Sequence, residues 1–353
     1  MSHAWQHALG RLRTGGGILC LSLLGLAGLM GPSPAAAGYL DRDEVQAFID
    51  QAVDETGVAR ERIEQWLGGA AYQQKIIDAI TRPAESKTWG EYRPIFLTEK
   101  RIEGGVAFMD ENRALLDEVA ATYGVSPYVI TAIIGVETYY GRITGGYRVI
   151  DALTTLGFDY PRRGAFFREQ LIDFIRLAGE ENLDMDRAEG SYAGAMGLPQ
   201  FIPSSYRHYA VDGDGDGRRD LWDSYHDVFA SVANYFVEHG WGQGEPVMFE
   251  VDINGAEVDD LLNRVRDLKP KATLAELRAR GVQVPDDAPS VPDDFAVMLF
   301  TLTDGDQVSY HVGLNNFYVI TRYNHSVLYA TAVWQLAQAI EQAVERRRGQ
   351  GAG

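Results

Sequence analysis

One acidic residue stands on an apolar helical pattern. Glu137 follows Ile130, Ile133 and Ile134 at spacings of seven, four and three residues, which place side chains on one face of a helix. Burial raises the pKa of a carboxyl group, and a carboxyl that stays protonated near neutral pH can donate a proton to a glycosidic oxygen. Glu137 is therefore a candidate general acid. The same spacing also fits a Glu on a partly exposed helical turn, or one paired with a nearby Arg.

A second group of acidic residues has the spacing of a calcium loop. The segment 212–223 places Asp at loop positions 1, 3 and 5 and Gly at position 6, as in an EF-hand. So many carboxylates in one turn repel one another unless a cation is present, which favours Ca²⁺ over an acidic surface turn without metal. The predicted ligands are Asp212, Asp214 and Asp216, the carbonyl of Arg218, and either Asp223 or Asp227 as the last ligand.

Polar and aromatic residues in the segments 160–163, 190–200 and 322–324 could bind sugar. Aromatic faces suit sugar rings, Arg can hold carboxylates, and Ser and Gln can bind acetamido groups and hydroxyls. Taken singly, each of these residues is more often structural. The sequence contains no G-x-S-x-G elbow and no phosphate-binding glycine loop, and its His residues lack a metal-ligand spacing.

The elements that must position these residues are mostly helices. Helices are expected over the apolar stripes near 45–53 and 63–67 and over 98–122, 127–141, 165–179, 227–239, 274–280 and 326–346. Strands are expected at 248–253, 296–302 and 317–321, with a turn at Asp304-Gly305, and Thr81–Pro94 is expected to be a loop. The predicted fold class is α+β: a mainly helical body with a small strand-containing insertion near 246–315.

The charge balance excludes some functions. The chain has 353 residues, with 32 basic against 50 acidic residues and a net charge of −18. Nucleic acids and anionic membrane surfaces are bound mainly through clustered Lys and Arg, so neither is an expected partner. The single Cys20 cannot form an intramolecular disulfide or a metal cluster, and no organic cofactor is predicted.

Residues 1–37 have the pattern of a cleavable secretory signal. Arg11 and Arg13 precede the apolar run 18–30, and Ala35-Ala36-Ala37 forms a cleavage site. The run is too short for a membrane span, which needs about 20 apolar residues. Cys20 follows Leu19 near the start of the run, which argues against a lipoprotein anchor. Cleavage after Ala37 would leave a mature chain without cysteine or membrane span, exported to the periplasm.

Several short runs occur in a fixed order along the chain. They are GVET at 135–138, DALTTL at 151–156, YPRR at 160–163, GAMG at 194–197, QFIPSSY at 200–206, SVANYF at 231–236 and FYVITRYNHS at 317–326. Together these runs resemble the lytic murein transglycosylase B family, from about Tyr39 to the last helix. The resemblance is specific because so many runs occur in the same order.

The resemblance implies a lysozyme-like catalytic core that binds peptidoglycan glycan strands. The family cuts the MurNAc-β-1,4-GlcNAc bond without water and leaves a 1,6-anhydromuramoyl end, with Glu137 as the single acid and base. Family members also hold Ca²⁺ in an EF-hand-like loop, which matches 212–216. The family's cleft residues correspond to Tyr92, Arg162, Arg163, Ser191, Gln200, Tyr235, Tyr323 and Asn324. The expected parts are a helical part at 38–125, the core at 126–245 with its calcium loop at 212–227, the insertion at 246–315, and a return to the core with a closing helix at 316–353.

Two positions depart from the family pattern. Phe166 stands where relatives can carry a cleft Tyr, so a hydroxyl contact there is not expected. The loop between Trp222 and Ser231 is about one residue longer than in relatives, which leaves the last calcium ligand open between Asp223 and Asp227.

Two rival functions remain at this point. A muramidase would hydrolyse the same bond with water, usually with a second carboxylate across the bond, and no second candidate stands out in the catalytic runs. A non-catalytic, calcium-stabilised peptidoglycan-binding protein is the other alternative.

Overall fold

The computed structural model describes residues 38–82, 87–263 and 267–351, and the predicted signal at 1–37 lies outside these described residues. Within them the chain forms two compact units. The first, here the mixed unit, comprises the described residues within 87–96 and 239–335. The second, here the helical unit, comprises the described residues 38–82, 97–238 and 336–351.

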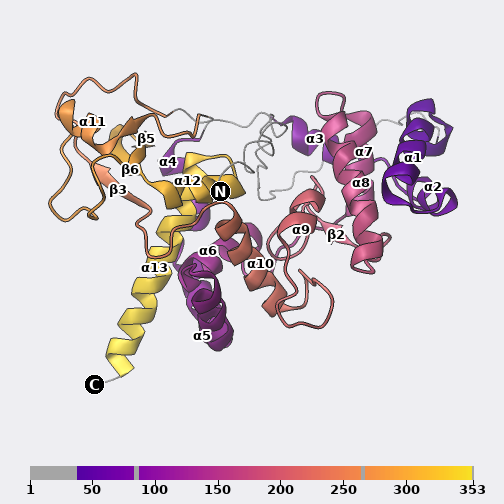
Figure 1. The fold of residues 1–353 in the computed structure, drawn as a ribbon, viewed down its shortest axis with the longest axis horizontal. Coiled ribbons are helices and arrows are strands. Elements are labelled where there is room, and N and C mark those ends of the chain that lie inside the picture. Colours follow the sequence, from indigo (N-terminus) through magenta and orange to yellow (C-terminus); the bar gives the residue numbers. More distant parts are fainter. Residues whose placement is uncertain (1–37, 83–86, 264–266, 352–353) are drawn as a thin grey trace, which may run out of the picture. The chain divides into compact units, whose positions relative to one another are not determined.

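The helical unit consists of helices and one small sheet (Figure 1). Its elements are η1 (Tyr39–Asp41), α1 (Asp43–Thr56), α2 (Arg60–Gly68), α3 (Gln74–Thr81), α5 (Glu99–Tyr123), α6 (Pro127–Thr138), β1 (Tyr147–Arg148), α7 (Val149–Asp159), α8 (Gly164–Glu180), β2 (Glu189–Gly190), α9 (Pro203–Tyr209), α10 (Tyr225–Glu238) and the C-terminal end of α13 (Val327–Gly351).

Two helices form the centre of this unit. Every residue of α6 from Val129 to Val136 is buried, and so is every residue of α7 from Val149 to Phe158. Helix α6 packs against α5 and α10, and α7 packs against α8. A helix surrounded on all sides is mostly apolar in sequence, as α6 is, whereas α7 also buries the polar residues Asp151, Thr154 and Thr155.

Local signals fix where α6 begins. The Ser126 hydroxyl accepts the backbone N–H of Tyr128, and Pro127 occupies the first helical turn, where its missing N–H costs nothing. Helix α5 begins in the same way, because the Thr98 hydroxyl accepts the N–H of Arg101. The short sheet pairs β1 with β2 antiparallel, with Tyr147 opposite Gly190.

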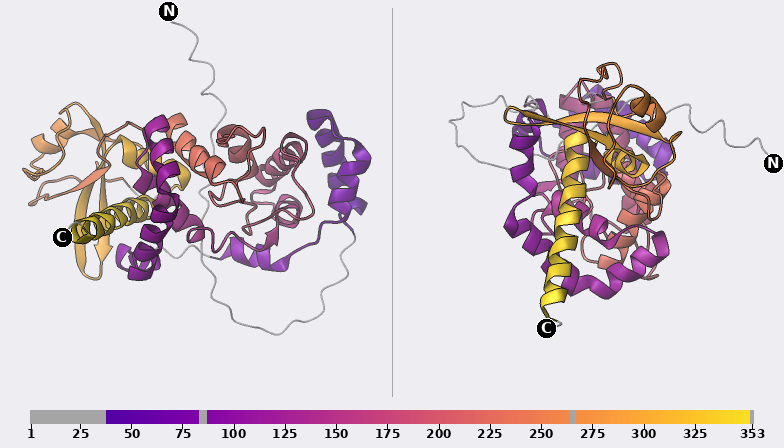
Figure 2. Two further views of the ribbon diagram at one scale, coloured as in Figure 1. Left: turned by 90° about the horizontal axis from the view of Figure 1, so that it is seen from below. Right: turned by 90° about the vertical axis from the view of Figure 1, so that its left-hand side faces the viewer.

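The mixed unit is built around a four-stranded antiparallel sheet in the order β3-β6-β5-β4, seen in orange shades in Figure 2. Leu299 and Val312 face each other across β5 and β6 and are buried with Leu277 of α11. Its elements are α4 (Trp89–Phe96), β3 (Met248–Val251), β4 (Ala272–Thr273), α11 (Leu274–Ala279), β5 (Ala296–Asp304), β6 (Gln307–Gly313), α12 (Asn315–Tyr323) and the N-terminal end of α13.

The expected fold class is confirmed, because the protein is mainly helical with small sheets. Three local predictions are wrong. Phe317–Thr321 lies in helix α12, since a short apolar run does not distinguish a buried strand from a buried helix turn. The strand that pairs with β5 through the Asp304-Gly305 turn is instead β6, at Gln307–Gly313. The predicted loop Thr81–Pro94 contains the start of helix α4.

Among the described residues, no single helix is long and apolar enough to cross a membrane. The consecutive helices α5 and α6 reach the required length and apolarity only as a pair, and they are bent by 113° at their junction.

Candidate active site and metal loop

Glu137 lies in the last turn of α6. It is the only charged residue of this helix, and from Val129 to Thr138 it is the only residue that is not buried. The helix that carries Glu137 is therefore apolar and buried, as its sequence predicts. An apolar helix with one half-buried carboxylic acid at its end is a suitable support for an acid catalyst.

The chain turns sharply after Glu137. Tyr139 and Tyr140 both have left-handed backbone angles, with φ of 53° and 59°. Such angles are unusual for bulky residues and persist only where neighbours hold them. Thr138 provides part of that support, because its hydroxyl accepts the N–H of Gly141 at 3.1 Å and shares its proton between the carbonyls of Ile134 at 3.2 Å and Leu198 at 3.3 Å.

The bond to Leu198 attaches the end of α6 to the segment 190–200, where two predicted cleft residues lie. The amide nitrogen of Gln200 donates to the carbonyls of Thr144 at 3.0 Å and Gly197 at 2.9 Å. The Ser191 hydroxyl accepts the backbone N–H groups of Ala193 and Ala195 at 3.3 and 3.0 Å. The polar groups of Gln200 and Ser191 therefore shape this turn, and it lies beside the turn that follows Glu137.

The paired arginines stand at the start of α8. Arg162 is exposed, whereas Arg163 is half-buried with its guanidinium 4.3 Å from the ring centre of Phe166. Burial lowers the pKa of Arg163, and the nearby Tyr160 and Tyr192 raise it. The Phe166 ring thus makes a cation–π contact with Arg163, which gives this departure from the family pattern a structural role.

Tyr235 lies on α10 and is buried among aromatic rings. Its ring centre is 4.8 Å from that of Tyr209 and 5.6 Å from that of Phe201. Phe201 follows Gln200 directly, so this packing connects α10 with the same turn.

Three predicted cleft residues belong to the mixed unit. Tyr92 lies on α4, with its ring 5.2 Å from that of Phe96. Tyr323 ends α12, and Asn324 follows it as a buried residue whose carbonyl accepts the N–H of Ser326 at 2.7 Å. The other six predicted residues, Glu137 included, lie in the helical unit.

The acidic loop gathers three carboxylates. Oxygens of Asp212, Asp214 and Asp227 all lie within 4.8 Å of one another, an arrangement that could hold a metal ion. Asp227 is on the first turn of α10 and is 1% exposed. Burial raises the pKa of Asp227, and so do the neighbouring charges of Asp214 and Asp212, while hydrogen bonds from the backbone of Asp220 and Gly213 lower it. A cation at this point would neutralise the charge that burial penalises.

The remaining acidic residues of the loop have other partners. Asp216 accepts the N–H of Arg218 at 2.8 Å, and Asp223 is exposed and outside the three-carboxylate group. Asp212 closes the turn by accepting the N–H groups of Gly215 and Gly217 at 2.7 and 2.9 Å. Of the two residues considered as last ligand, the geometry favours Asp227.

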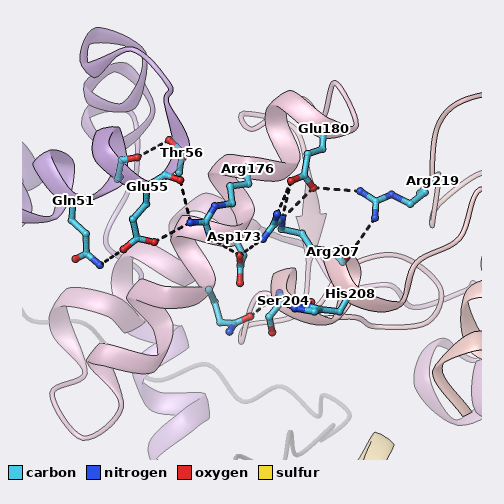
Figure 3. A network of polar contacts seen from close by, with 12 residues as sticks. Gln51, Glu55, Thr56, Asp173, Arg176, Glu180, Ser204, Arg207, His208 and Arg219 are labelled. Atoms are coloured by element: carbon cyan, nitrogen blue, oxygen red, sulfur yellow. Dashed lines mark hydrogen bonds and ion pairs between the residues drawn. The ribbon is translucent and has the colours of Figure 1, made fainter. Parts of the chain in front are cut away.

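A chain of ion pairs ties this loop to the helices (Figure 3). Arg219, in the second half of the loop, bonds through Nε to Glu181 at 2.6 Å and reaches Glu180 at 3.4 Å. Arg207 of α9 pairs with Glu180 at 2.7 Å and with Asp173 of α8 at 2.8 Å. The network continues through the ion pairs of Arg176 with Asp173 (3.0 Å) and with Glu55 at the end of α1 (2.9 Å).

The chain matches the family model described as the transglycosylase SLT domain over residues 41–338. This chain belongs to that transglycosylase family. It is 39% identical over 318 residues to the membrane-bound lytic murein transglycosylase B of Escherichia coli K12, covering 86% of this chain and 84% of the relative.

Solved transglycosylases have the same fold. The soluble lytic transglycosylase SltB1 of Pseudomonas aeruginosa superposes with a TM-score of 0.80 at 47% identity, covering 85% of this chain and 99% of SltB1. The E. coli lytic transglycosylase Slt35, solved in complex with calcium, gives 0.76 at 38% identity over 85% and 93%. SltB3 of P. aeruginosa, solved with NAG-NAM-pentapeptide, gives 0.74 at 32% identity over 84% and 78%.

These matches confirm the predicted family, the lysozyme-like fold and the enzyme class: the chain is a lytic transglycosylase of peptidoglycan. Sequence reasoning missed one residue beside Glu137. Arg101 of α5 donates a guanidinium hydrogen bond to the carbonyl of Gly135 and lies 4.6 Å from the ring centre of Tyr139. Its position 34 residues before Gly135 gives no pattern that a sequence alone could reveal.

Proposed function

We propose that Glu137 is the single acid and base of a non-hydrolytic cleavage of the MurNAc-β-1,4-GlcNAc bond. The observation that carries this proposal is its place as the one charged and only partly buried residue on an otherwise apolar, buried helix end. That place falls within the segment matched by the transglycosylase family model.

The reaction needs only one carboxyl group. Neutral Glu137 donates its proton to the bridging glycosidic oxygen as the C1–O bond breaks, and the substrate's acetamido oxygen shields the positive charge at C1. The Glu137 carboxylate then accepts the proton of the muramoyl C6 hydroxyl, whose oxygen forms the new bond to C1. The nucleophile is already attached to the substrate, so no water and no second carboxylate are required.

The predicted cleft residues would bind the glycan in support of this step. Arg162 and Arg163 supply positive charge for substrate carboxylates in a protein that is otherwise strongly acidic. Because the Gln200 amide nitrogen is engaged by two carbonyls, its Oε1 is the atom that would accept a hydrogen bond from sugar. Tyr235 from α10 would contribute to this binding surface. By the family resemblance, Tyr92, Tyr323 and Asn324 are also proposed to bind glycan.

We further propose a structural Ca²⁺ ion bound by Asp212, Asp214 and Asp227. The three carboxylates converge, and a related transglycosylase has been solved with calcium. Asp216 and the carbonyl of Arg218 would complete the oxygen ligands, and Asp223 would remain outside.

We also propose that residues 1–37 direct export to the periplasm, where the substrate lies, and that 38–353 act as one catalytic chain. The support is the charge and hydropathy pattern of the first residues. Sequencing the N-terminus of protein recovered from the periplasm should give Gly38 as the first residue. An intact Met1 start would contradict the signal.

The catalytic proposal is tested on purified sacculi. Released muropeptides should carry anhydro ends that resist borohydride reduction, as read by mass spectrometry. Mostly reducible ends would show a muramidase instead, and no release at all would show a binding protein.

The variant Glu137→Gln removes the titrating proton while keeping the shape of the side chain. It should lose at least about a hundredfold in rate, since general acid–base catalysis contributes on that order. Glu103→Gln, an exposed Glu on the neighbouring α5, is the matched control and should keep wild-type activity. Equal activity of Glu137→Gln and wild type would reject the assignment.

A further inference from the structure

A residue from another helix forms a hydrogen bond to the last turns of α6. Arg101, in the first turn of α5, is half-buried and donates its guanidinium N–H to the carbonyl of Gly135, two residues before Glu137. The last carbonyls of a helix have no partner within the helix, and a guanidinium is a strong donor for one of them. The Arg101 side chain therefore satisfies a carbonyl in the helical turn that carries Glu137.

The same arginine supports the strained turn that follows. Its guanidinium carbon lies 4.6 Å from the ring centre of Tyr139, and its backbone carbonyl accepts the hydroxyl of Tyr140 at 2.8 Å. Both tyrosines have left-handed backbone angles. One arginine thus contacts the residues on both sides of Glu137 through three separate interactions.

The packing leaves little freedom for this turn. The Tyr140 ring lies directly over Gly135, where a Cβ atom would stand only 2.7 Å from the ring. Burial raises the pKa of Tyr140, so its hydroxyl stays protonated and can donate to Arg101. Gly135, Tyr140 and Arg101 form one contact group, here the Arg101 clamp.

We propose that Arg101 is a positioning residue that holds the carboxyl of Glu137 in its reactive place through the Arg101 clamp. The inference rests on the proposed acid–base role of Glu137. Arg101 acts through the backbone on either side of Glu137 and takes no part in the proton transfers. Small displacements of a catalytic group lower the rate strongly while leaving substrate binding nearly unchanged.

The test compares Arg101→Met, Arg101→Lys and Arg142→Met in full-length protein. Arg101→Met should lower kcat on sacculi about tenfold, with KM changed less than about twofold, because transition-state alignment is lost and binding is kept. Arg101→Lys should recover part of kcat, since an ammonium can donate to the Gly135 carbonyl but cannot stack as a planar group.

Arg142→Met is the matched control. Arg142 lies 5.0 Å from the same Tyr139 ring but is exposed, and in the described structure its side chain has no bond to a carbonyl of α6. Its kcat and KM should match those of the wild type. A wild-type kcat in Arg101→Met, or an equal loss in Arg142→Met, would overturn the clamp.

Hydrogen exchange gives a second reading that does not depend on activity. The N–H of Tyr140 bonds to the carbonyl of Ile134 at 3.2 Å, and that of Gly141 bonds to Thr138. Both amides should exchange faster in Arg101→Met than in Arg142→Met. Unchanged exchange in Arg101→Met would reject the clamp even if the proposed acid–base role of Glu137 holds. Faster exchange in Arg101→Met, together with full activity of Glu137→Gln, would reject only the acid–base role.

Discussion

The substitution Asp227→Asn gives the sharpest test of the calcium site. Asp227 is buried, carries one of the three converging carboxylates, and accepts the N–H groups of Gly213 and Asp220 at 2.7 and 2.6 Å. Asparagine keeps the size of the side chain but removes its charge and places an NH₂ group against one of those donors. The variant should therefore lose calcium affinity and, separately, about 1–3 kcal/mol of stability with or without calcium.

The magnitude follows from binding linkage. Calcium at about 100 times its dissociation constant adds about 2.7 kcal/mol to the free energy of unfolding of the wild type. For a unit of about 200 residues, this raises Tm by about 5–10 °C. Asp227→Asn should reduce this calcium-dependent shift to nearly zero.

The assay is a pair of thermal melts for each protein, one with calcium and one with a chelator. Only the difference between the two melts matters, because it cancels the structural cost of the substitution. Asp223→Asn is the matched control: it makes the same charge change in the same loop, at an exposed residue outside the three-carboxylate group. A full shift in Asp227→Asn, or a lost shift in Asp223→Asn, would refute this choice of ligands.

Two further predictions concern stability. Arg207→Gln breaks the ion pairs with Asp173 and Glu180 and should lower the free energy of unfolding, measured in urea, by about 1–3 kcal/mol. The control is Arg187→Gln, because the Arg187 side chain is 88% exposed; it should change the free energy of unfolding by less than about 1 kcal/mol. Equal losses in the two variants would contradict the network. Burial lowers the pKa of His311, so the unfolded chain takes up the proton first and stability should fall as the pH drops below about 6.5. His311→Phe keeps the stacking on Phe300. In urea titrations at about pH 7.5 and about pH 5.5, this variant should lose less free energy of unfolding between the two pH values than the wild type. An equal loss would show that His311 does not cause the pH dependence.

Local signals predicted two of the helices beside the site, α6 and α8, with good accuracy. Helix α6 was expected from Ser126-Pro127 and observed over Pro127–Thr138, and α8 was expected over 165–179 and observed over Gly164–Glu180. Capping residues and a 3.6-residue apolar period act within one segment, so the sequence shows them directly.

The errors occurred where long-range packing decides the structure. The apolar run at Phe317–Thr321 fits either a strand or a helix turn, and in the structure it lies in helix α12. Strand β6 has a weak pattern of its own and is identified by its ladder with β5 and β3. The strands that pair with a given strand lie elsewhere in the sequence, so the residues of that strand do not reveal them.

The sequence by itself determined the family, the acidic residue on an apolar helix and the spacing of the calcium loop, because each is a pattern within one segment or a set of ordered runs. Only the tertiary structure decided between Asp223 and Asp227 as the carboxylate facing Asp212 and Asp214, since that depends on how α10 returns to the loop. It also placed Arg101 against Gly135 across 34 residues of chain. Catalytic chemistry is encoded in residue types at short spacing, whereas the positions of those residues are set by contacts that form only when distant segments pack together.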